Sequence, residues 1–246
     1  PLIKNDFIIN NNLFNIPKKI MLLLDNLKPK KSFYLETKYK INKTKQVSKL
    51  VKINSIDLAN KIYVIGNFEN YDYFKENKNE LLKLFTLKKK YVDHKNSFID
   101  KLQNSNSVSI HIRRGRFSDQ SSSNNIDLIK KSNDFTNNTI NYINRAIEYF
   151  NKTINNPKFF IWTNDINDIN EYTKRLNTNN FTIVTGNNSI NDFYLFKFSK
   201  HFIVGPSSFH WWGAWLNQCE NKICVRPSDI NPSNNTNFWP KEWIPI

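Results

Sequence analysis

The sequence predicts an α/β protein in which residues 105–246 form a doubly wound parallel sheet. Segments typical of strands alternate there with segments whose apolar residues recur at helical spacing. Such alternation favours parallel strands joined by helices that cover both faces of the sheet. With 246 residues, 39% of them hydrophobic, the chain can bury a substantial core. The regular pattern begins near residue 105, so we divide the chain into residues 1–104 and 105–246.

The first part is less regular. Residues 1–58 carry apolar pieces separated by Asn and Lys, and residues 61–67 (KIYVIGN) predict a strand. Residues 71–102 lack Pro and Gly and have apolar residues at helical spacing, which predicts one or two helices.

The second part alternates strictly. Strands are predicted at 107–112 (SVSIHI), 158–163 (KFFIWT), 181–186 (FTIVTG), 201–205 (HFIVG) and 222–226 (KICVR). Helices are predicted around the apolar face of Ile140, Ile143, Ile147, Phe150 and Ile154, and then at 166–177, 191–200 and 207–218. Residues 120–134, rich in Ser and Asn, predict a polar loop.

Charge and cysteine content narrow the function classes. A net charge of +15 is typical of proteins that bind nucleic acids. The lysines are scattered along this chain, however, so we expect no nucleic-acid partner. Attraction to anionic substrates or to a membrane surface stays open, and with it peripheral membrane association. Cys219 and Cys224 lie in CENKIC with no nearby histidine, a poor metal site, and no metal is expected. No apolar run is long enough to span a membrane.

A doubly wound sheet binds ligands at the carboxyl ends of its strands. The strand at 107–112 runs directly into Arg113, Arg114 and Gly115. Guanidinium groups bind phosphates bidentately, and a glycine lets a ligand approach the backbone. The alternative is that one arginine pairs with a carboxylate and the other faces water. His111 alternates to the other face from its apolar neighbours, and by itself is more often a buried core histidine than a catalyst.

Two more strand ends carry polar groups. Ser207 and Ser208 lie between a predicted strand and the helix that follows it. Their hydroxyls and the free backbone amides of the first helical turn predict an anion-binding site. Asn164 and Asp165 end another strand, and Asp165 either hydrogen-bonds a guanine edge or a ribose, or caps the next helix. This constellation suits a nucleoside diphosphate conjugate. The chain has neither GxxxxGK[ST] nor GxGxxG, which argues against a P-loop nucleotidase or an ordinary dehydrogenase.

Four motifs in this order and spacing resemble the α-1,2-fucosyltransferases of glycosyltransferase family 11. They are SIHIRRG, FFIWTND, DFYLFKFSKHFIV and SSFHWWGAWLN, and GNFENYDYFKENKNELLKLF upstream is also similar. The resemblance covers about residues 60–246. SSFHWWGAWLN is highly specific, whereas the double-arginine motif is shared with α-1,6- and protein O-fucosyltransferases.

The resemblance implies a GT-B-like fold and an inverting transfer that needs neither metal nor cofactor. L-Fucose would move from GDP-β-L-fucose to the 2-hydroxyl of a terminal β-galactoside, so the partners would be GDP-fucose and a β-galactoside-terminated glycan. Bacterial members of the family work at the cytoplasmic face of the membrane and animal members in the Golgi. We expect a cytoplasmic protein, with the Golgi lumen as the alternative if an N-terminal anchor has been removed.

The resemblance also assigns roles by motif. Arg113 would hold the diphosphate, His111 would contact the nucleoside, and Asp165 would contact the guanine side. Ser207 and Ser208 would bind phosphate. Further candidate substrate contacts in the same motifs are Arg114, Gly115, Asn164, Phe209 and Trp212.

The chain departs from the family pattern in ways that bear on catalysis. The family's segment resembling GGLGNQ is absent, so the N-terminal domain is expected to be partial or diverged. Arg116 stands where the family has Asp, and we expect Asp119 to orient the phosphate-binding arginine in its place. His210 stands where the family usually has Ser. The general base stays open among Asp119, Asp165 and Asp192.

Two alternatives to an α-1,2-fucosyltransferase remain. One is a fucosyltransferase of another linkage or with a protein acceptor, against which the tryptophan-rich motif argues. The other is a catalytically silent protein that binds a GDP-sugar or a carbohydrate, which the missing segment and Arg116 favour.

Overall fold

The computed structural model describes residues 31–35, 37–40, 46–49, 58–66, 68–114, 126–230 and 235–246. Contacts within the chain separate two compact units. One comprises residues 1–84 and 232–240, and the other comprises residues 85–231 and 241–246.

The first unit contains two small strand pairs followed by short helices. Its elements are β1 (Lys31–Leu35), β2 (Thr37–Lys40), β3 (Gln46–Lys49), β4 (Leu58–Ile65), the 3-10 turns Tyr71–Tyr73 and Lys75–Asn77, and α2 (Lys78–Leu84). β1 pairs with β4 in parallel and β2 with β3 antiparallel. The strand predicted at 61–67 is confirmed as β4. The helical prediction for 71–102 is only partly right, because this segment is divided into several short helices.

The second unit is built on a six-stranded sheet in which every neighbouring pair is parallel. Its strands are β5 (Asn106–Ile112), β6 (Pro157–Thr163), β7 (Phe181–Ile183), β8 (His201–Ile203), β9 (Cys224–Arg226) and β10 (Ile244–Pro245). The order is β7-β6-β5-β8-β9-β10, which is the 3-2-1-4-5-6 order of dinucleotide-binding sheets. The predicted parallel α/β sheet is confirmed, with the short β10 as an unpredicted sixth strand.

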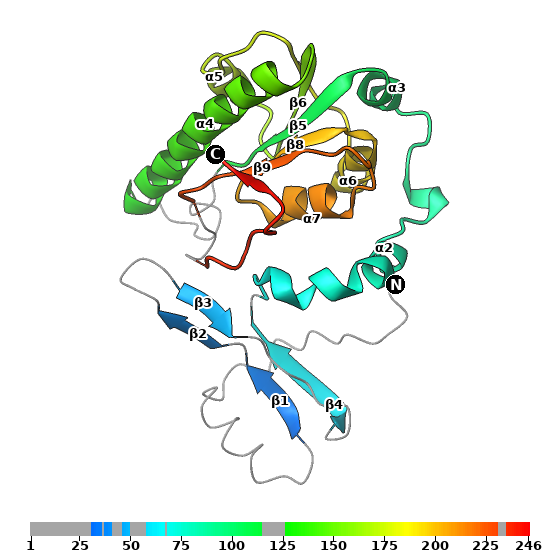
Figure 1. The fold of residues 1–246 in the computed structure, drawn as a ribbon, viewed down its shortest axis with the longest axis vertical. Coiled ribbons are helices and arrows are strands. Elements are labelled where there is room, and N and C mark those ends of the chain that lie inside the picture. Colours follow the sequence, from blue (N-terminus) through cyan, green and yellow to red (C-terminus); the bar gives the residue numbers. More distant parts are fainter. Residues whose placement is uncertain are drawn as a thin grey trace. The chain divides into compact units, whose positions relative to one another are not determined.

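Helices lie on both faces of this sheet (Figure 1). They are α3 (Phe98–Gln103), α4 (Ile126–Thr153), α5 (Ile169–Thr173), α6 (Ser189–Leu195) and α7 (Ser208–Leu216), with 3-10 turns at Lys89–Tyr91 and Phe196–Phe198. α4 and α5 cover the face formed by Val108, Ile110 and Ile112 of β5. α7 and the 3-10 turn after α6 cover the opposite face, where His210 contacts Ser109.

The predicted loop at 120–134 is wrong from residue 126 onward, because α4 begins at Ile126. The inner face of its first half is polar: Ser132, Thr136 and Thr139 are buried. Thr136 and Thr139 donate their hydroxyls to carbonyl oxygens four residues earlier, at 2.9 and 2.8 Å. The fully buried residues of this stretch are therefore polar, and hydrophobic periodicity does not detect it.

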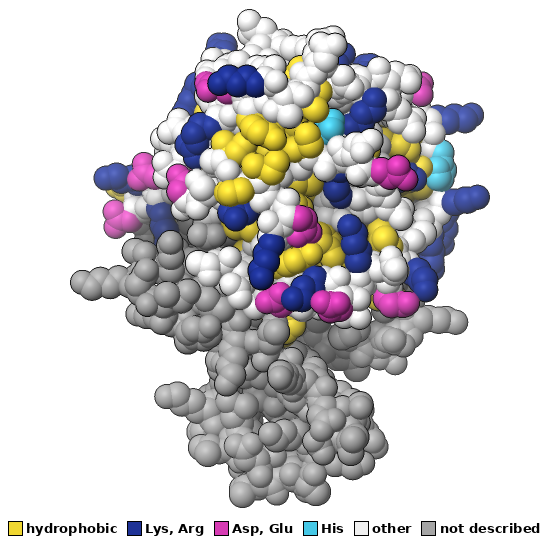
Figure 2. Space-filling view, viewed as in Figure 1, with side chains coloured by type: hydrophobic (Ala, Val, Ile, Leu, Met, Phe, Trp, Pro, Cys, Tyr) yellow, Lys and Arg dark blue, Asp and Glu magenta, His cyan; other side chains and the backbone are white. Residues whose placement is uncertain are grey.

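Charge is spread over the surface. On the face shown in Figure 2, Lys and Arg side chains are interspersed with Asp and Glu. Among the described residues, no helix is both long and apolar enough to cross a membrane. No group of three or more His, Cys, Asp or Glu side chains in these residues could hold a metal ion.

α7 packs closely on the 3-10 turn through a glycine. A Cβ on Gly213 would lie 2.3 Å from Cδ2 of Phe196, a ring that is fully buried. Beyond the helix, Asn217 donates to the backbone oxygens of Phe196 and Ser199 at 3.0 and 2.8 Å. Lys222 donates to the oxygens of Ala214 and Asn217 at 2.7 and 2.6 Å, which satisfies carbonyls at the end of α7.

We expect Gly213→Ala to lower the free energy of unfolding by roughly 1–3 kcal/mol, because the buried ring must shift to admit a methyl group. Urea unfolding of the purified protein measures this. Adding Phe196→Leu to Gly213→Ala should recover part of the loss. A Gly213→Ala protein as stable as the parent would contradict the close contact.

Candidate functional site

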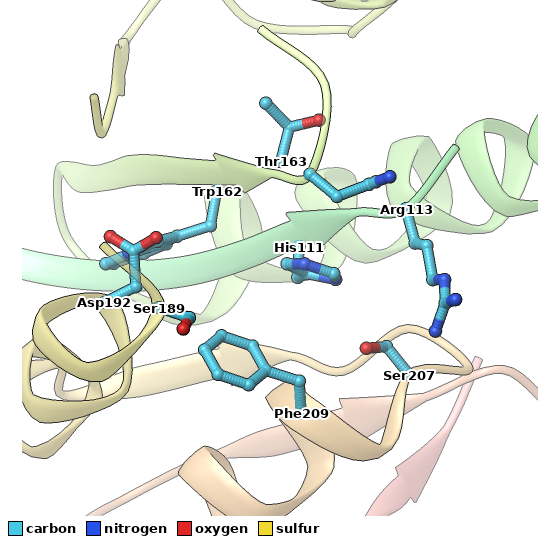
Figure 3. Close-up of a pocket in the computed structure, with 9 residues that line it drawn as sticks. His111, Arg113, Trp162, Thr163, Ser189, Asp192, Ser207 and Phe209 are labelled. Atoms are coloured by element: carbon cyan, nitrogen blue, oxygen red, sulfur yellow. The ribbon is translucent and has the colours of Figure 1, made fainter. Parts of the chain in front are cut away.

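The strand order creates a crevice between β5 and β8. β5 continues through α4 to β6 on one side, whereas β8 continues through α7 to β9 on the other. Loops at the carboxyl ends of such neighbours diverge and leave room for a ligand. A pocket of about 250 Å³ lies there (Figure 3). It is lined by His111, Arg113, Trp162, Thr163, Asn164, Ser189, Asp192, Ser207 and Phe209.

One end of the pocket is cationic. Arg113 follows β5, is exposed, and forms no ion pair with any described residue. Ser207, the N-cap of α7, is 4% exposed and makes no side-chain capping hydrogen bond within that helix. Figure 3 shows the Arg113 guanidinium and the Ser207 hydroxyl on the same side of the pocket. The first-turn amides of α7 and its dipole add to the positive potential. This end can bind an anion.

The neighbouring arginine is neutralised within the protein. Arg114 donates from Nη1 to Asp165 at 2.8 Å and to Asp168 at 2.6 Å, and its guanidinium lies 4.8 Å from the centre of the Tyr172 ring. Asn164 accepts from the backbone N–H of Arg114 at 2.8 Å and so ties the ends of β5 and β6 together. This is the arrangement that the sequence analysis gave as the alternative to an oxyanion site: Arg114 is ion-paired, and Arg113 is exposed with no ion pair to a described residue.

One histidine, His111, lines the pocket, and a second, His210, lies next to it. His111 is 7% exposed, and its Nδ1 has no hydrogen-bond partner among the described residues. Burial, with a smaller contribution from the charge of Arg113, lowers the pKa of His111 from 6.5 to about 4. The fully buried His210 ring lies 5.8 Å from that of His111, and its Nε2 is 2.8 Å from the Ser109 hydroxyl. His111 is therefore uncharged at neutral pH and can accept or donate a hydrogen bond.

The other end of the pocket carries a carboxylate. Asp192 of α6 lies across the pocket from Arg113 in Figure 3. Burial raises the pKa of Asp192, and the neighbouring N–H groups of Asn187 and Trp162 oppose this. The side-chain nitrogens of Asn187 and Trp162 nevertheless form no hydrogen bond with a described residue, and the buried Oδ1 of Asp192 has no hydrogen-bond partner among these residues either. A ligand with N–H groups would satisfy it.

The structure brings some of the predicted site residues together and separates others. His111, Arg113, Asn164, Ser207 and Phe209 line the pocket. Arg114, Asp165, Ser208 and Trp212 do not line it; Trp212 instead stacks on Phe85, with ring centres 5.1 Å apart. Gly115 and Asp119 lie outside the described residues, as does Arg116. Trp211 and Trp215 are buried.

Sequence reasoning missed Trp162 and Ser189 as pocket residues and named Asp192 only as a possible base. Strand alternation places Trp162 on the same face of the sheet as His111, its partner in the β5–β6 register. That signal was available from the sequence. Ser189 and Asp192 follow a strand end within one short helix, but no pattern showed that α6 turns them toward β5.

Comparison with known proteins identifies the family. The model for glycosyl transferase family 11 matches residues 7–246. The chain belongs to this family. Its family 11 relatives include an alpha-1,2-colitosyltransferase of Escherichia coli, 29% identical over 200 residues, which are 79% of this chain and 66% of the relative. An Escherichia coli protein named O-antigen biosynthesis glycosyltransferase WbnK is 43% identical over 44 residues, which are 18% of this chain and 15% of that protein. The chain thus spans just under two thirds of the first relative.

The buried histidine predicts a pH-dependent stability. The pKa of His111 is lower in the folded protein than in the unfolded chain, so unfolding takes up a proton between about pH 6.5 and pH 4. Stability is fully present above this window and falls as the pH drops through it, by on the order of 3 kcal/mol for this group.

Urea unfolding at several pH values tests this expectation. His111→Asn should lose less stability between pH 6.5 and pH 4 than the parent protein. Equal slopes for the parent and His111→Asn would show that His111 is not held neutral.

Proposed function

We propose that this chain is an inverting transferase that moves L-fucose from GDP-β-L-fucose to the 2-hydroxyl of a terminal β-galactoside, giving an α-1,2 linkage. The observation that carries the proposal is the arrangement of the pocket at the β5–β8 switch point. An arginine with no ion pair to a described residue and a helix N-terminus lie at one end of it, and a buried carboxylate lies at the other. Family membership supports the reaction class, and the name of the colitosyltransferase relative supports an α-1,2 linkage.

The cationic end suits the diphosphate. In the transfer, the acceptor hydroxyl gives up its proton to solvent or to one of the candidate carboxylates, and its oxygen forms a bond to the anomeric carbon while the bond from that carbon to the β-phosphate oxygen breaks. The departing GDP takes the electron pair, so negative charge grows on the β-phosphate. Arg113, the Ser207 hydroxyl and the first-turn amides of α7 are in place to stabilise that charge without reorganisation. Arg114, held by two carboxylates, keeps the end of β5 in position.

The carboxylate end suits guanine. The N1–H and exocyclic amino group of guanine lie side by side and can donate together to one carboxylate, whereas the corresponding edge of adenine has no such pair of donors. Asp192 has a buried oxygen that needs a donor, and His111 and Phe209 provide the surface between it and Arg113. The acidic end thereby favours a GDP-sugar over an ADP- or UDP-sugar.

The alternative donor sugar is colitose, for which the family 11 relative is named. We further propose that the parallel sheet is the donor half of a GT-B-like enzyme, in which residues 1–104 contribute a partial or diverged acceptor-side domain. Transfer assays with both donor sugars and β-galactoside acceptors, followed by linkage analysis of the product, test the proposed reaction. A protein that binds GDP-fucose but transfers to no β-galactoside would be the silent binder.

Nucleotide selectivity tests the carboxylate end. We expect calorimetry to show tighter binding of GDP than of ADP or UDP. Asp192→Asn keeps the shape of the side chain and removes its charge. It should weaken the binding of GDP by roughly tenfold to a hundredfold, which is the usual effect of losing a hydrogen bond to a charged group. ADP binding should change little. Equal losses for GDP and ADP would indicate a general disturbance of the pocket.

Kinetics test the cationic end. We expect Arg113→Ala to lower kcat/KM by about 10²-fold or more, by analogy with the loss of one preorganised donor to a developing negative charge. Arg145→Ala is the matched control, because Arg145 lies on α4 and pairs with Asp229. A folded Arg113→Ala protein with near parental activity would refute the role of Arg113.

A further inference from the structure

Ser207 reaches the pocket on a short turn between β8 and α7. The two residues before it are Gly205 and Pro206, of which the first has no side chain and the second has no N–H to donate. The N–H of Ser207 donates to the oxygen of Gly205 at 2.7 Å, within the turn itself. The Ser207 hydroxyl lies on the same side of the pocket as Arg113 (Figure 3), so its place depends on how firmly the start of the turn is held.

The turn starts at Val204, whose two backbone groups are both hydrogen-bonded. Its N–H donates to the oxygen of Val225, the middle residue of β9, at 2.9 Å. Its carbonyl oxygen accepts from the hydroxyl of Tyr142, on α4, at 3.1 Å. The same hydroxyl lies 2.9 Å from the oxygen of Val225. One phenol hydroxyl from a helix thus bonds both β9 and the first residue after β8, at the point where the turn leaves the sheet.

The hydroxyl of Tyr142 is a donor at any pH at which the protein would be assayed. The side chain is fully buried, and burial raises the pKa of Tyr142 well above its ordinary value. A phenol carries one hydrogen, so the two carbonyl oxygens share it. The oxygen of Val225 also accepts from the N–H of Val204, and it keeps that partner if the hydroxyl is removed. The effect of removing the hydroxyl is therefore expected at Val204, the residue that begins the turn.

The same face of α4 packs against the next residue of the turn. A Cβ on Gly205 would lie 4.0 Å from Cγ2 of Thr139, which is one helical turn before Tyr142. It would also lie 3.3 Å from the backbone oxygen of His111, at the end of β5. These contacts restrict the middle of the turn, and the bond from Tyr142 fixes its start.

We propose that Tyr142 is a positioning residue, which holds Ser207 and the first-turn amides of α7 against the diphosphate through its bond to Val204. The proposal rests on the proposed function, because it takes the cationic end of the pocket as the diphosphate site. Tyr142 does not line the pocket and does not touch the substrate. A side chain in the core thereby sets the affinity for the phosphates, but not the affinity for the nucleoside.

Tyr142→Phe tests this role, because it removes the hydroxyl and keeps the ring that fills the core. By calorimetry, we expect GDP to bind roughly threefold to tenfold more weakly, which is the usual effect of losing one hydrogen bond. Guanosine, which has no phosphate, should bind as it does to the parent protein. A general disturbance of the pocket would affect both ligands alike.

Tyr149→Phe is the matched control. Tyr149 lies two turns later on the same helix and packs against the same core, and its hydroxyl makes no hydrogen bond with a described residue. This variant should bind both ligands like the parent. A conservative replacement provides the rescue: 4-aminophenylalanine in place of Tyr142 keeps an N–H donor at the same position. It should restore part of the GDP affinity that Tyr142→Phe loses.

Hydrogen exchange of the ligand-free protein gives a second readout that needs no nucleotide. In Tyr142→Phe, the N–H of Ser207 should exchange faster than in the parent, because its acceptor Gly205 belongs to the released turn. The N–H of Asn217 donates to Gly213 at 3.2 Å, at the other end of α7. It should exchange as in the parent.

Unchanged GDP affinity in Tyr142→Phe, or equal losses for GDP and guanosine, would overturn the positioning role. Equal acceleration of exchange at Ser207 and Asn217 would also overturn it, because it indicates a general loosening of α7. Failure of the parent protein to bind GDP would overturn the proposed function instead. In that event the exchange of the Ser207 N–H still decides whether Tyr142 holds the turn.

Discussion

The ion pairs of Arg114 with Asp165 and Asp168 determine how the rest of the site is organised. Two adjacent guanidinium groups at one strand end repel each other, and the protein resolves this by giving both carboxylates to one of them. The pairing ties the end of β5 to the segment after β6 and, through Tyr172, to α5. Arg113, which lines the pocket, forms no ion pair with any described residue. The proposed binding of a phosphate in this pocket depends on this unequal division, because an arginine with its own carboxylate offers little attraction to a phosphate.

The polar face of β5 sets a second constraint. Ser107, Ser109 and His111 are buried beneath α7 and its neighbouring turn, and buried polar groups are costly unless paired. Ser107 accepts from the N–H of Lys200 at 3.0 Å, and Ser109 meets His210 at 2.8 Å. His111, last in this row, lines the pocket, and its Nδ1 has no hydrogen-bond partner among the described residues. Along this one strand, the first two polar residues are therefore hydrogen-bonded within the protein, and the third lines the pocket.

The order of strands and helices after residue 105 could be predicted from the sequence, because the alternation typical of a strand and the apolar spacing typical of a helix are both local properties of the chain. Alternation in SVSIHI and KFFIWT marks β5 and β6, and the serines before SSFHWWGAWLN mark the start of α7. Local sequence patterns do not predict the first turns of α4, where Ser132 and Thr136 face inward. They also do not predict which of Arg113 and Arg114 forms ion pairs, since both residues follow the same strand and nothing local distinguishes them. The sequence shows that residue 192 is a carboxylate, but not that one of its oxygens is buried without a hydrogen-bond partner among the described residues.

By itself, the sequence determined the parallel α/β architecture, the strand ends that carry polar groups, and the resemblance to family 11. All three depend on residue type and on spacing along the chain. Only the tertiary structure decided which arginine has no ion pair among the described residues, which histidine nitrogen has no hydrogen-bond partner there, and that Asn96 bonds to Asn187. Asn96 and Asn187 are separated by 91 positions, and Arg114 and Asp165 by 51. The reason is physical: a hydrogen bond or an ion pair depends on distances of a few ångströms, and the packing of the whole sheet sets those distances.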